Sequence, residues 1–423
     1  MLNERYEKYE DYIAHQSEKT NDPARQEVWL GKEWSLKLEG FENEFSKIKH
    51  NFNKDSKILC LGSRTGQEVQ AFFNLGFPNA TGIDIVPFPP LTVEGDIHDL
   101  KFPDESIDLV YTNIVDHSVD PQKMIQEIER VLTPTGAAFL QVQVGLNQDD
   151  YTEFEIRNPI HDVMPLFERS FCIHAGTINQ DASPNFAGMN FEMLFQKNEV
   201  LERLYHRYGT FDTISVPENY LEIWNDINLD MQNKKLDEAN VFDLERRTKI
   251  LDRLSKRAYY LACLADSLEM TKIAEVGTAQ GWQFYSFCQY ASENGGKVYS
   301  CDPRDVRNEE YRQKFEEEKK VGFFTNATSR EMANECNEIE LFYIDGLHGK
   351  GTVIQDVLNL KKSQSTKRVP VWVFDDFDER FGCFEDIWSI CRASGQFKVV
   401  KIGETASGKP SHQAIIIGRM ETR

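Results

Sequence analysis

The 423-residue sequence lacks several features that would each assign it to a class of protein. Its eight cysteines form no Cys-x-x-Cys pair, so we expect reduced, buried thiols instead of a disulfide or zinc framework. No run of about 18 apolar residues is present, which predicts that no helix spans a membrane. Lys and Arg number 48 against 69 Asp and Glu, and the resulting net charge of −21 disfavours nucleic acid as a partner. The polar N-terminus resembles no secretory signal, so we expect a cytoplasmic protein.

What the sequence does contain is a regular alternation of strand-like and helix-like patterns. The apolar runs ILCL, ATGIDIV, IDLVYTN and AAFLQVQV are each followed by a turn or an amphipathic segment. Such alternation is typical of an α/β fold in which helices cover both faces of a mostly parallel sheet. The segment FCIHAGTINQ and the segment FEMLFQK predict an antiparallel hairpin that closes the sheet.

The same order of patterns occurs twice, which predicts two tandem domains. We assign an N-terminal helical segment to residues 1–45, a first domain to 46–198, a helical connector to 199–245 and a second domain to 246–423. Each domain is expected to be Rossmann-like, with a mostly parallel seven-stranded sheet and a terminal antiparallel hairpin. The connector, rich in charge and Asn, has the alternative role of an oligomer contact or an active-site cover, since it also offers Tyr220, Ile223 and Trp224.

The two copies correspond residue by residue at their glycine turns. Gly62 and Gly66 precede Gly277 and Gly281 by the same 215 positions, and in each copy the glycines follow an apolar strand and open a helix. An acid ends the next strand in each copy, Asp84 in the first and Asp302 in the second. A turn without side chains lets a ligand approach backbone N–H groups, and a carboxylate on the neighbouring strand accepts the hydroxyl protons of a ribose. This predicts an adenosine-containing cofactor, although the G-x-G-x-x-G dinucleotide fingerprint is absent.

The first half resembles the class I S-adenosylmethionine (SAM)-dependent methyltransferases. The segments ILCLGSRTGQEV, GIDIVP, GDIHDLKFPDESIDLVYTN and MIQEIERVLTPTGAAFL are similar to the successive motifs of that family. The resemblance implies that Gly62 and Gly66 line SAM, that Asp84 binds the ribose and that Asp96 approaches the adenine. Cys60 stands where the family usually has an acid. Arg64 stands where it usually has a glycine, and pairing of Arg64 with the cofactor carboxylate is one use for it.

The second half resembles the metal-dependent O-methyltransferases that act on the sugars of macrolides. The similar segments are IAEVGTAQG, VYSCDPRD, FYIDGLHGKG and VFDDF. The resemblance implies that Glu275, Gly277 and Gly281 hold the methionine end of SAM and that Asp302 binds the ribose. It also implies that the loop from Asn326 to Ser329 surrounds the adenine. An acid is present at Glu275, the position that corresponds to Cys60, so the second half is expected to be the catalyst.

Three carboxylates in the second half follow neighbouring strands of the predicted sheet. Asp345 ends one strand, and Asp375 and Asp376 end the next. Ligands of parallel sheets gather beyond the carboxyl ends of the strands, and three converging carboxylates require a cation between them. Oxygen ligands favour Mg²⁺, with Mn²⁺ as a substitute. We therefore predict a metal site that activates a hydroxyl, with His348 as the base that removes its proton and Asp345 assisting it.

The sequence leaves alternatives open for the reaction and its acceptor. The expected acceptor is a small-molecule or glycan hydroxyl, on a sugar or a natural-product precursor. Asn113 takes the place of Asp345 in the first half, where Asp116 and His117 could support a second, metal-free methyl transfer in a tandem enzyme. A non-catalytic SAM-binding scaffold or regulator is the remaining alternative. Neither nucleic acid nor membrane is expected as a partner, and a homo-oligomer is compatible with the connector.

Overall fold

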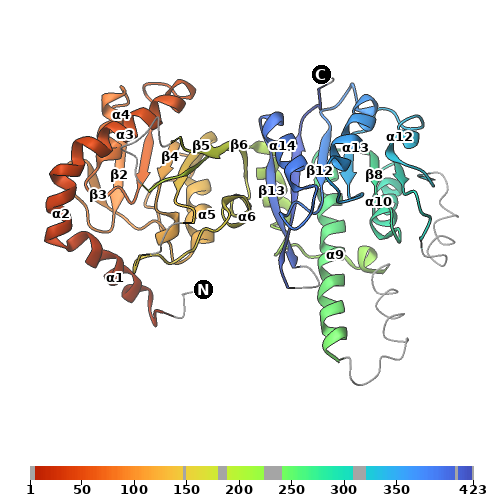
Figure 1. The fold of residues 1–423 in the computed structure, drawn as a ribbon, viewed down its shortest axis with the longest axis horizontal. Helices are drawn as coiled ribbons and strands as arrows, with labels where there is room; N and C mark the ends of the chain where they lie inside the picture. The colour runs from red at the N-terminus through yellow and green to blue at the C-terminus, as the bar shows by residue number, and fades with distance from the viewer. Residues whose placement is uncertain are drawn as a thin grey trace. The chain divides into compact units, whose positions relative to one another are not determined.

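The computed structural model describes residues 5–145, 149–179, 188–222, 241–307, 321–404 and 408–421. The chain divides into two compact units, Met1–Glu202 and Arg203–Arg423, each built around one sheet (Figure 1). Part of the predicted connector, residues 223–240, lies outside the described residues. Tyr220, offered above as an oligomer contact, is buried in the core of the second unit. Among the described helices, none is long and apolar enough to cross a membrane.

The first unit begins with helices and continues as alternating strands and helices. Its opening helices are α1 (Tyr9–Asn21), α2 (Pro23–Leu30), α3 (Lys32–Ile48) and the short η1 (Lys49–Asn51). Its strands are β1 (Ile58–Leu61), β2 (Ala80–Asp84), β3 (Thr92–Glu94), β4 (Ile107–Thr112), β5 (Leu132–Val142), β6 (Ser170–Thr177) and β7 (Phe191–Lys197). Between them lie α4 (Gln67–Asn74), η2 (Val115–His117), α5 (Pro121–Val131), α6 (Pro159–Asp162) and η3 (Met164–Leu166). Helix α7 (Glu199–Tyr208) follows β7.

The second unit repeats this pattern after the long helix α9 (Val241–Ser267), drawn in green in Figure 1. Its strands are β8 (Lys272–Val276), β9 (Lys297–Cys301), β10 (Gly322–Thr325), β11 (Leu341–Ile344), β12 (Val371–Phe374), β13 (Lys398–Glu404) and β14 (Pro410–Ile417). The remaining described helices are α10 (Trp282–Glu293), α12 (Ser329–Met332), α13 (Thr352–Leu360), η5 (Lys361–Ser363) and α14 (Phe384–Ser394).

The two sheets have the same topology. Their strand orders are β3-β2-β1-β4-β5-β7-β6 and β10-β9-β8-β11-β12-β14-β13. In each sheet the first five strands are parallel, and the last strand of that unit, β7 or β14, inserts antiparallel between two neighbours. The predicted α/β class, the mostly parallel seven-stranded sheets and the terminal hairpins are confirmed. In each sheet the strand order runs outward to one side from the first strand and then continues on its other side. The neighbouring strands β1 and β4, and likewise β8 and β11, therefore border the crevice where such sheets bind ligands.

In the first unit, α3 and α4 cover one face of the sheet. Alternate strand residues point to that face, and Cys60, Tyr111 and Phe139 stand side by side in the register of β1, β4 and β5. Phe45 of α3 stacks on Phe72 of α4, with ring centroids 4.1 Å apart, and its edge meets Tyr111. This apolar layer fixes the start of α4 against the end of β1.

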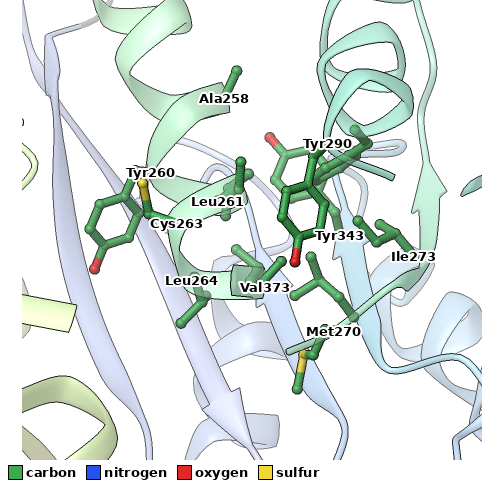
Figure 2. Packing of buried hydrophobic residues seen from close by; sticks show 14 of the residues in the cluster. Ala258, Tyr260, Leu261, Cys263, Leu264, Met270, Ile273, Tyr290, Tyr343 and Val373 are labelled. Atoms are coloured by element: carbon green, nitrogen blue, oxygen red, sulfur yellow. The ribbon is translucent and has the colours of Figure 1, made fainter. Parts of the chain in front are cut away.

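In the second unit, α9 and α10 form the corresponding layer. Figure 2 shows Leu261 of α9 beside Tyr343 of β11, in a buried cluster that also contains Leu264 of α9 and Val373 of β12. Because Tyr343 pairs in register with Glu275 of β8, the core packing also sets the level of that carboxylate in the sheet. The fold therefore places Glu275 next to the turn that follows β8.

Candidate functional site

Both glycine turns adopt a backbone shape that glycine favours. Gly62 and Gly66 have φ of 67° and 87°, and Gly277 and Gly281 have φ of 94° and 93°. A Cβ atom on Gly277 would lie 1.9 Å from the carbonyl oxygen of Asp345, so the turn touches the end of the neighbouring strand. The absence of a side chain at Gly277 therefore lets the turn pack against the end of β11.

The acid after the second strand of each unit is held against its glycine turn. Asp84 accepts hydrogen bonds from the backbone N–H groups of Arg64 and Val86, at 2.9 and 3.0 Å. Asp302 accepts equivalent bonds from Ala279 and Arg304, at 3.0 and 2.9 Å. Each carboxylate is thereby oriented beside the first glycine, where the ribose was predicted to bind.

Asp345, His348 and Asp376 gather at the carboxyl ends of β11 and β12. The Nε2 atom of His348 lies 2.7 Å from Oδ2 of Asp376 and 3.8 Å from Oδ1 of Asp345. The nearby carboxylates of Asp345 and Asp376 raise the pKa of His348 to about 10, so the imidazole is protonated at neutral pH. Burial, followed by the charge of Asp375, raises the pKa of Asp345 to about 7. The cluster is an acid–base group with a shared positive charge at its centre.

Asp376 has an unusual backbone conformation that helps to form this cluster. Its φ is 52°, in the left-handed region that non-glycine residues rarely adopt and that costs about 1 to 3 kcal/mol. Phe377 donates its backbone N–H to the carbonyl of His412 at 3.0 Å, which fixes the chain after the turn. Strained residues of this kind concentrate at functional sites, and here the turn sends the Asp376 carboxylate to His348 while Asp375 points elsewhere.

Asp375 is bound on both oxygens by other side chains of the second unit. Its Oδ2 lies 2.5 Å from Nη1 of Arg257 and accepts a 2.9 Å hydrogen bond from the Tyr343 hydroxyl, and its Oδ1 accepts one of 3.0 Å from Gln413. Burial would raise the pKa of Asp375, but Arg257, Gln413 and Tyr343 hold it below its ordinary value. Asp375 therefore remains a carboxylate that is neutralised by protein groups.

Asp345, His348 and Asp376 offer donor atoms that could share one cation. One ligand atom from each lies within 4.8 Å of the other two. Two carboxylates and an imidazole fit a divalent cation, with positions left for water or a substrate oxygen. The predicted ligands were Asp345, Asp375 and Asp376. The structure brings Asp345 and Asp376 together, whereas Asp375 could join them only after release from Arg257.

The methionine end of SAM has a candidate partner in Glu275. Glu275 is fully buried, its Oε2 accepts a hydrogen bond from Ser300, and its Oε1 has no partner. Burial raises the pKa of Glu275 to about 8. A buried carboxylate oxygen without a donor fits the ammonium group of an amino-acid ligand. The residues of the second turn therefore fit the predicted cofactor.

The first unit has a cavity of about 330 Å³ beside its glycine turn. Gly62, Arg64, Glu68, Asn113 and His117 are among the residues that line it. A smaller adjoining cavity of about 60 Å³ is lined by Asp84, Ile85, Asp96 and Ile97. Helix α1 closes this second cavity with residues that include Tyr12 and Gln16.

The other predicted cofactor residues have specific surroundings. Both oxygens of Asp96 lie 2.8 Å from the hydroxyl of Tyr9, so an adenine amino group would compete with that tyrosine. Arg64 lies over the ring of Trp29, 4.8 Å from its centroid. Asn326 is exposed just after β10, whereas Ser329 is buried and bonds to Asp356 and Asn359, which fastens α12 to α13. The adenine role of the loop from Asn326 to Ser329 stays a prediction.

Sequence reasoning missed Arg257 and Glu68. Arg257 neutralises Asp375 from the middle of α9, across 118 positions of the chain, and its only sequence signal is a basic residue within an apolar stretch. Glu68 is buried in the first turn of α4, where an acid resembles an ordinary helix-start residue. In both cases the partner, or the lack of one, is a property of the folded chain.

Comparison with known proteins assigns the class. Two different protein-family models, both described as methyltransferase domain, match residues 59–140 and residues 274–377. These matches contain the two glycine turns and, in the second unit, Asp345 and Asp376. They support a class I SAM-dependent methyltransferase. The protein is therefore a methyltransferase enzyme, with a methyltransferase domain in each unit.

Solved structures with a similar fold include several methyltransferases. A methyltransferase from a complex with the Haloferax volcanii Trm112 activator is 14% identical, covers 45% of this chain and 98% of its own, and has a TM-score of 0.34. The Burkholderia thailandensis 1,6-didemethyltoxoflavin-N1-methyltransferase, solved with bound 1,6-didemethyltoxoflavin and S-adenosylhomocysteine, is 14% identical, covers 45% of this chain and 89% of its own, and has a TM-score of 0.34. A SAM-dependent methyltransferase from Aquifex aeolicus is 14% identical over 43% and 97%, at 0.30. No curated protein matches the sequence.

Proposed function

We propose that the second unit catalyses metal-assisted transfer of a methyl group from SAM to a hydroxyl of a small molecule, with Mg²⁺ or Mn²⁺ as the cation. The observation that carries this proposal is the group formed by Asp345, His348 and Asp376 next to the Gly277 turn. A sugar, a glycan or a natural-product precursor is the proposed acceptor, in keeping with the resemblance of the second half to O-methyltransferases of macrolide sugars.

Asp345 and Asp376 are the residues that would hold the cation, with His348 beside them as the base. When bound, Mg²⁺ would lower the pKa of a hydroxyl that coordinates it. His348 is protonated while its Nε2 faces the two carboxylates. Once those carboxylates are neutralised in another way, its Nε2 becomes available to take the hydroxyl proton. Gly277, Glu275 and Asp302 would orient the methyl donor, so that the acceptor oxygen, the methyl carbon and the sulfur are held in line.

Binding of Mn²⁺ to the full chain tests this proposal, with the free ion followed by electron paramagnetic resonance. We expect one site per chain, and a loss of affinity of at least about tenfold in Asp345→Asn and Asp376→Asn. Glu385→Gln removes an exposed acid from the start of α14 and is the matched control. Unchanged Mn²⁺ affinity in both aspartate variants would rule out a cation at this cluster.

A second candidate function is metal-free methyl transfer in the first unit. The imidazole of His117 donates from Nδ1 to the carbonyl of Tyr151 at 2.8 Å, which leaves the lone pair on Nε2. Burial lowers the pKa of His117, so the ring is neutral at pH 7, and it lines the 330 Å³ cavity. Lys19 lies 3.3 Å from Nε2 and pairs with Asp149. An acceptor that replaces the Lys19 ammonium at Nε2 could give its proton to His117.

Methyl transfer from radiolabelled SAM to a panel of hydroxylated small molecules, with EDTA present, separates the two candidates. The second candidate predicts chelator-resistant turnover that is lost in His117→Gln and kept in His348→Gln. If EDTA abolishes all turnover, or if His117→Gln retains the resistant fraction, the first unit has no such activity.

A further inference from the structure

Cys60 and Glu275 occupy the same place in the two sheets. Each lies two residues before the first glycine of its turn, and each is paired in register with a buried tyrosine, Tyr111 or Tyr343. In the second unit this place holds the carboxylate with an unpartnered oxygen described above. In the first unit it holds a fully buried thiol, whose pKa burial raises well above its usual value. A neutral thiol offers no charge to an ammonium group.

A second pair of equivalent positions differs in the opposite sense, with the acid in the first unit and an uncharged residue in the second. Glu68 and Gln283 are each the second residue after the last glycine of the turn, 215 positions apart, in the first turns of α4 and α10. Both are buried, with exposures of 7% and 5%. Oε2 of Glu68 has no hydrogen-bond partner, and neither has the amide of Gln283. Each unit thus contains one buried carboxylate at these two positions, supplied by the helix in the first unit and by the strand in the second.

The carboxylate of Glu68 lies close to the place that Glu275 fills in the other unit. Its negative charge raises the pKa of the Cys60 thiol and of the Tyr111 hydroxyl, after the larger effect of burial on each. Glu68 also lines the same cavity as Gly62. The exchange between the units therefore moves the carboxylate from strand to helix while keeping it next to the glycine turn.

The cations around Glu68 leave its buried oxygen without a bond. Arg64 and Lys37 attract the carboxylate and Asp84 repels it, but Arg64 lies over Trp29 and Lys37 pairs with Glu33 at 2.9 Å. A buried charge without a hydrogen-bonded partner is expensive, and the expense is offset when a cation binds. The site therefore fits a small cationic group that enters the cavity from solution.

We propose that Glu68 receives the primary ammonium of the amino-acid end of SAM or S-adenosylhomocysteine, which makes the first unit a second cofactor site. The inference rests on the proposed use of SAM. Glu68 takes the role in the first unit that Glu275 has in the second, so the absence of an acid at Cys60 does not remove the site. Asp84 and the Gly62 turn would hold the adenosine end of the same ligand.

Isothermal titration calorimetry of the full chain with S-adenosylhomocysteine tests the inference. We expect two equivalents to bind wild type. In Glu68→Gln, one of the two should weaken by about 10- to 100-fold, the loss expected for a hydrogen bond to a charged group. In Glu275→Gln the other equivalent should weaken. Glu27→Gln, at an exposed acid of α2, is the control that should leave both unchanged.

Two further measurements keep the test independent of folding. The nucleoside 5′-methylthioadenosine lacks the amino-acid end, so its affinity should be the same in Glu68→Gln and wild type if the pocket is intact. The double variant Cys60→Glu with Glu68→Gln copies the arrangement of the second unit and should recover the affinity for S-adenosylhomocysteine. Two equivalents of unchanged affinity in Glu68→Gln overturn the inference. A single equivalent in wild type, lost in Glu275→Gln, overturns it and leaves the proposed function standing, whereas no binding at all overturns both.

Discussion

Arg257 and Asp375 form a buried ion pair, with 2.5 Å between Nη1 and Oδ2, directly beneath the candidate metal site. In the first unit the equivalent neighbours carry different charges. There Tyr111 donates to Gln141, and Gln141 donates to Glu44 of α3 and to Glu192 of β7. In the second unit Tyr343 donates to Asp375, which accepts from Gln413. The hydrogen bonds are retained in both units, but the acid and the amide exchange places: Gln141 and Glu192 in the first unit correspond to Asp375 and Gln413 in the second.

The first prediction concerns the stability of this pair. Arg257→Met leaves Asp375 buried without its cation, and the free energy of unfolding of the second unit should fall by about 3 to 5 kcal/mol. Urea unfolding, with hydrogen exchange of β12 peptides to locate the loss, measures it. The double variant Arg257→Met with Asp375→Asn removes both charges and should recover most of the stability. Equal stability of the single and double variants would contradict the pairing.

The second prediction separates Asp375 from the candidate metal ligands. Because both oxygens of Asp375 are bound by protein groups, Asp375→Asn should bind Mn²⁺ within a few-fold of wild type. Asp376→Asn should lose at least about tenfold. If Asp375→Asn loses as much Mn²⁺ affinity as Asp376→Asn while remaining folded by circular dichroism, Asp375 is a ligand, as the sequence alone predicted.

The third prediction concerns Tyr343, which links the ion pair to the site. Its hydroxyl lies 2.9 Å from Asp375 and 3.2 Å from Oδ2 of Asp345. It therefore orients Asp345, a candidate metal ligand. Tyr343→Phe should weaken Mn²⁺ binding by about tenfold, since residues that orient metal ligands contribute that much. Tyr111→Phe, the same change at the equivalent position of the first unit, is the matched control. A similar effect of both variants would indicate a general loss of stability.

The fourth prediction is that, in the absence of ligand, Glu68 lowers the free energy of unfolding by an amount that depends on pH. Burial raises the pKa of Glu68 to about 7, above the 4.5 expected when the chain is unfolded. The folded state therefore favours the protonated acid. The stability that the protonated acid contributes is fully present below pH 4.5 and is lost as the pH rises through 7, by about 3 kcal/mol in total.

Glu68→Gln should consequently equal wild type in stability near pH 4 and exceed it by about 3 kcal/mol at pH 8. Hydrogen exchange of α4 peptides at pH 5 and pH 8, corrected for the intrinsic exchange rate, measures the difference. Glu27→Gln should show no such trend. A Glu68→Gln effect that is independent of pH would mean that the carboxylate is solvated or already paired.

Much of the fold followed from local patterns. Apolar runs and helical periodicity predicted the strands, their mostly parallel arrangement and both closing hairpins, because these patterns reflect backbone geometry within a few residues. The glycines at positions 62, 66, 277 and 281 and the acids Asp84 and Asp302 were recognisable for the same reason, since turn and strand end lie in a short stretch of sequence. The grouping of Asp345 with Asp376 followed from the rule that parallel strands end at one edge of a sheet.

The sequence by itself thus determined the class of fold, its repetition and the edge of each sheet where the candidate functional residues lie. Only the tertiary structure decided which acids have partners. Arg257 reaches Asp375 across the core, and Oε2 of Glu68 remains buried without a hydrogen-bond partner. Asp375 and Asp376 are adjacent in sequence, yet the left-handed turn sends one to an arginine and the other to a histidine. The physical reason is that the charge state of a carboxylate depends on burial and on groups that are distant in sequence, and neither is encoded in its immediate neighbours.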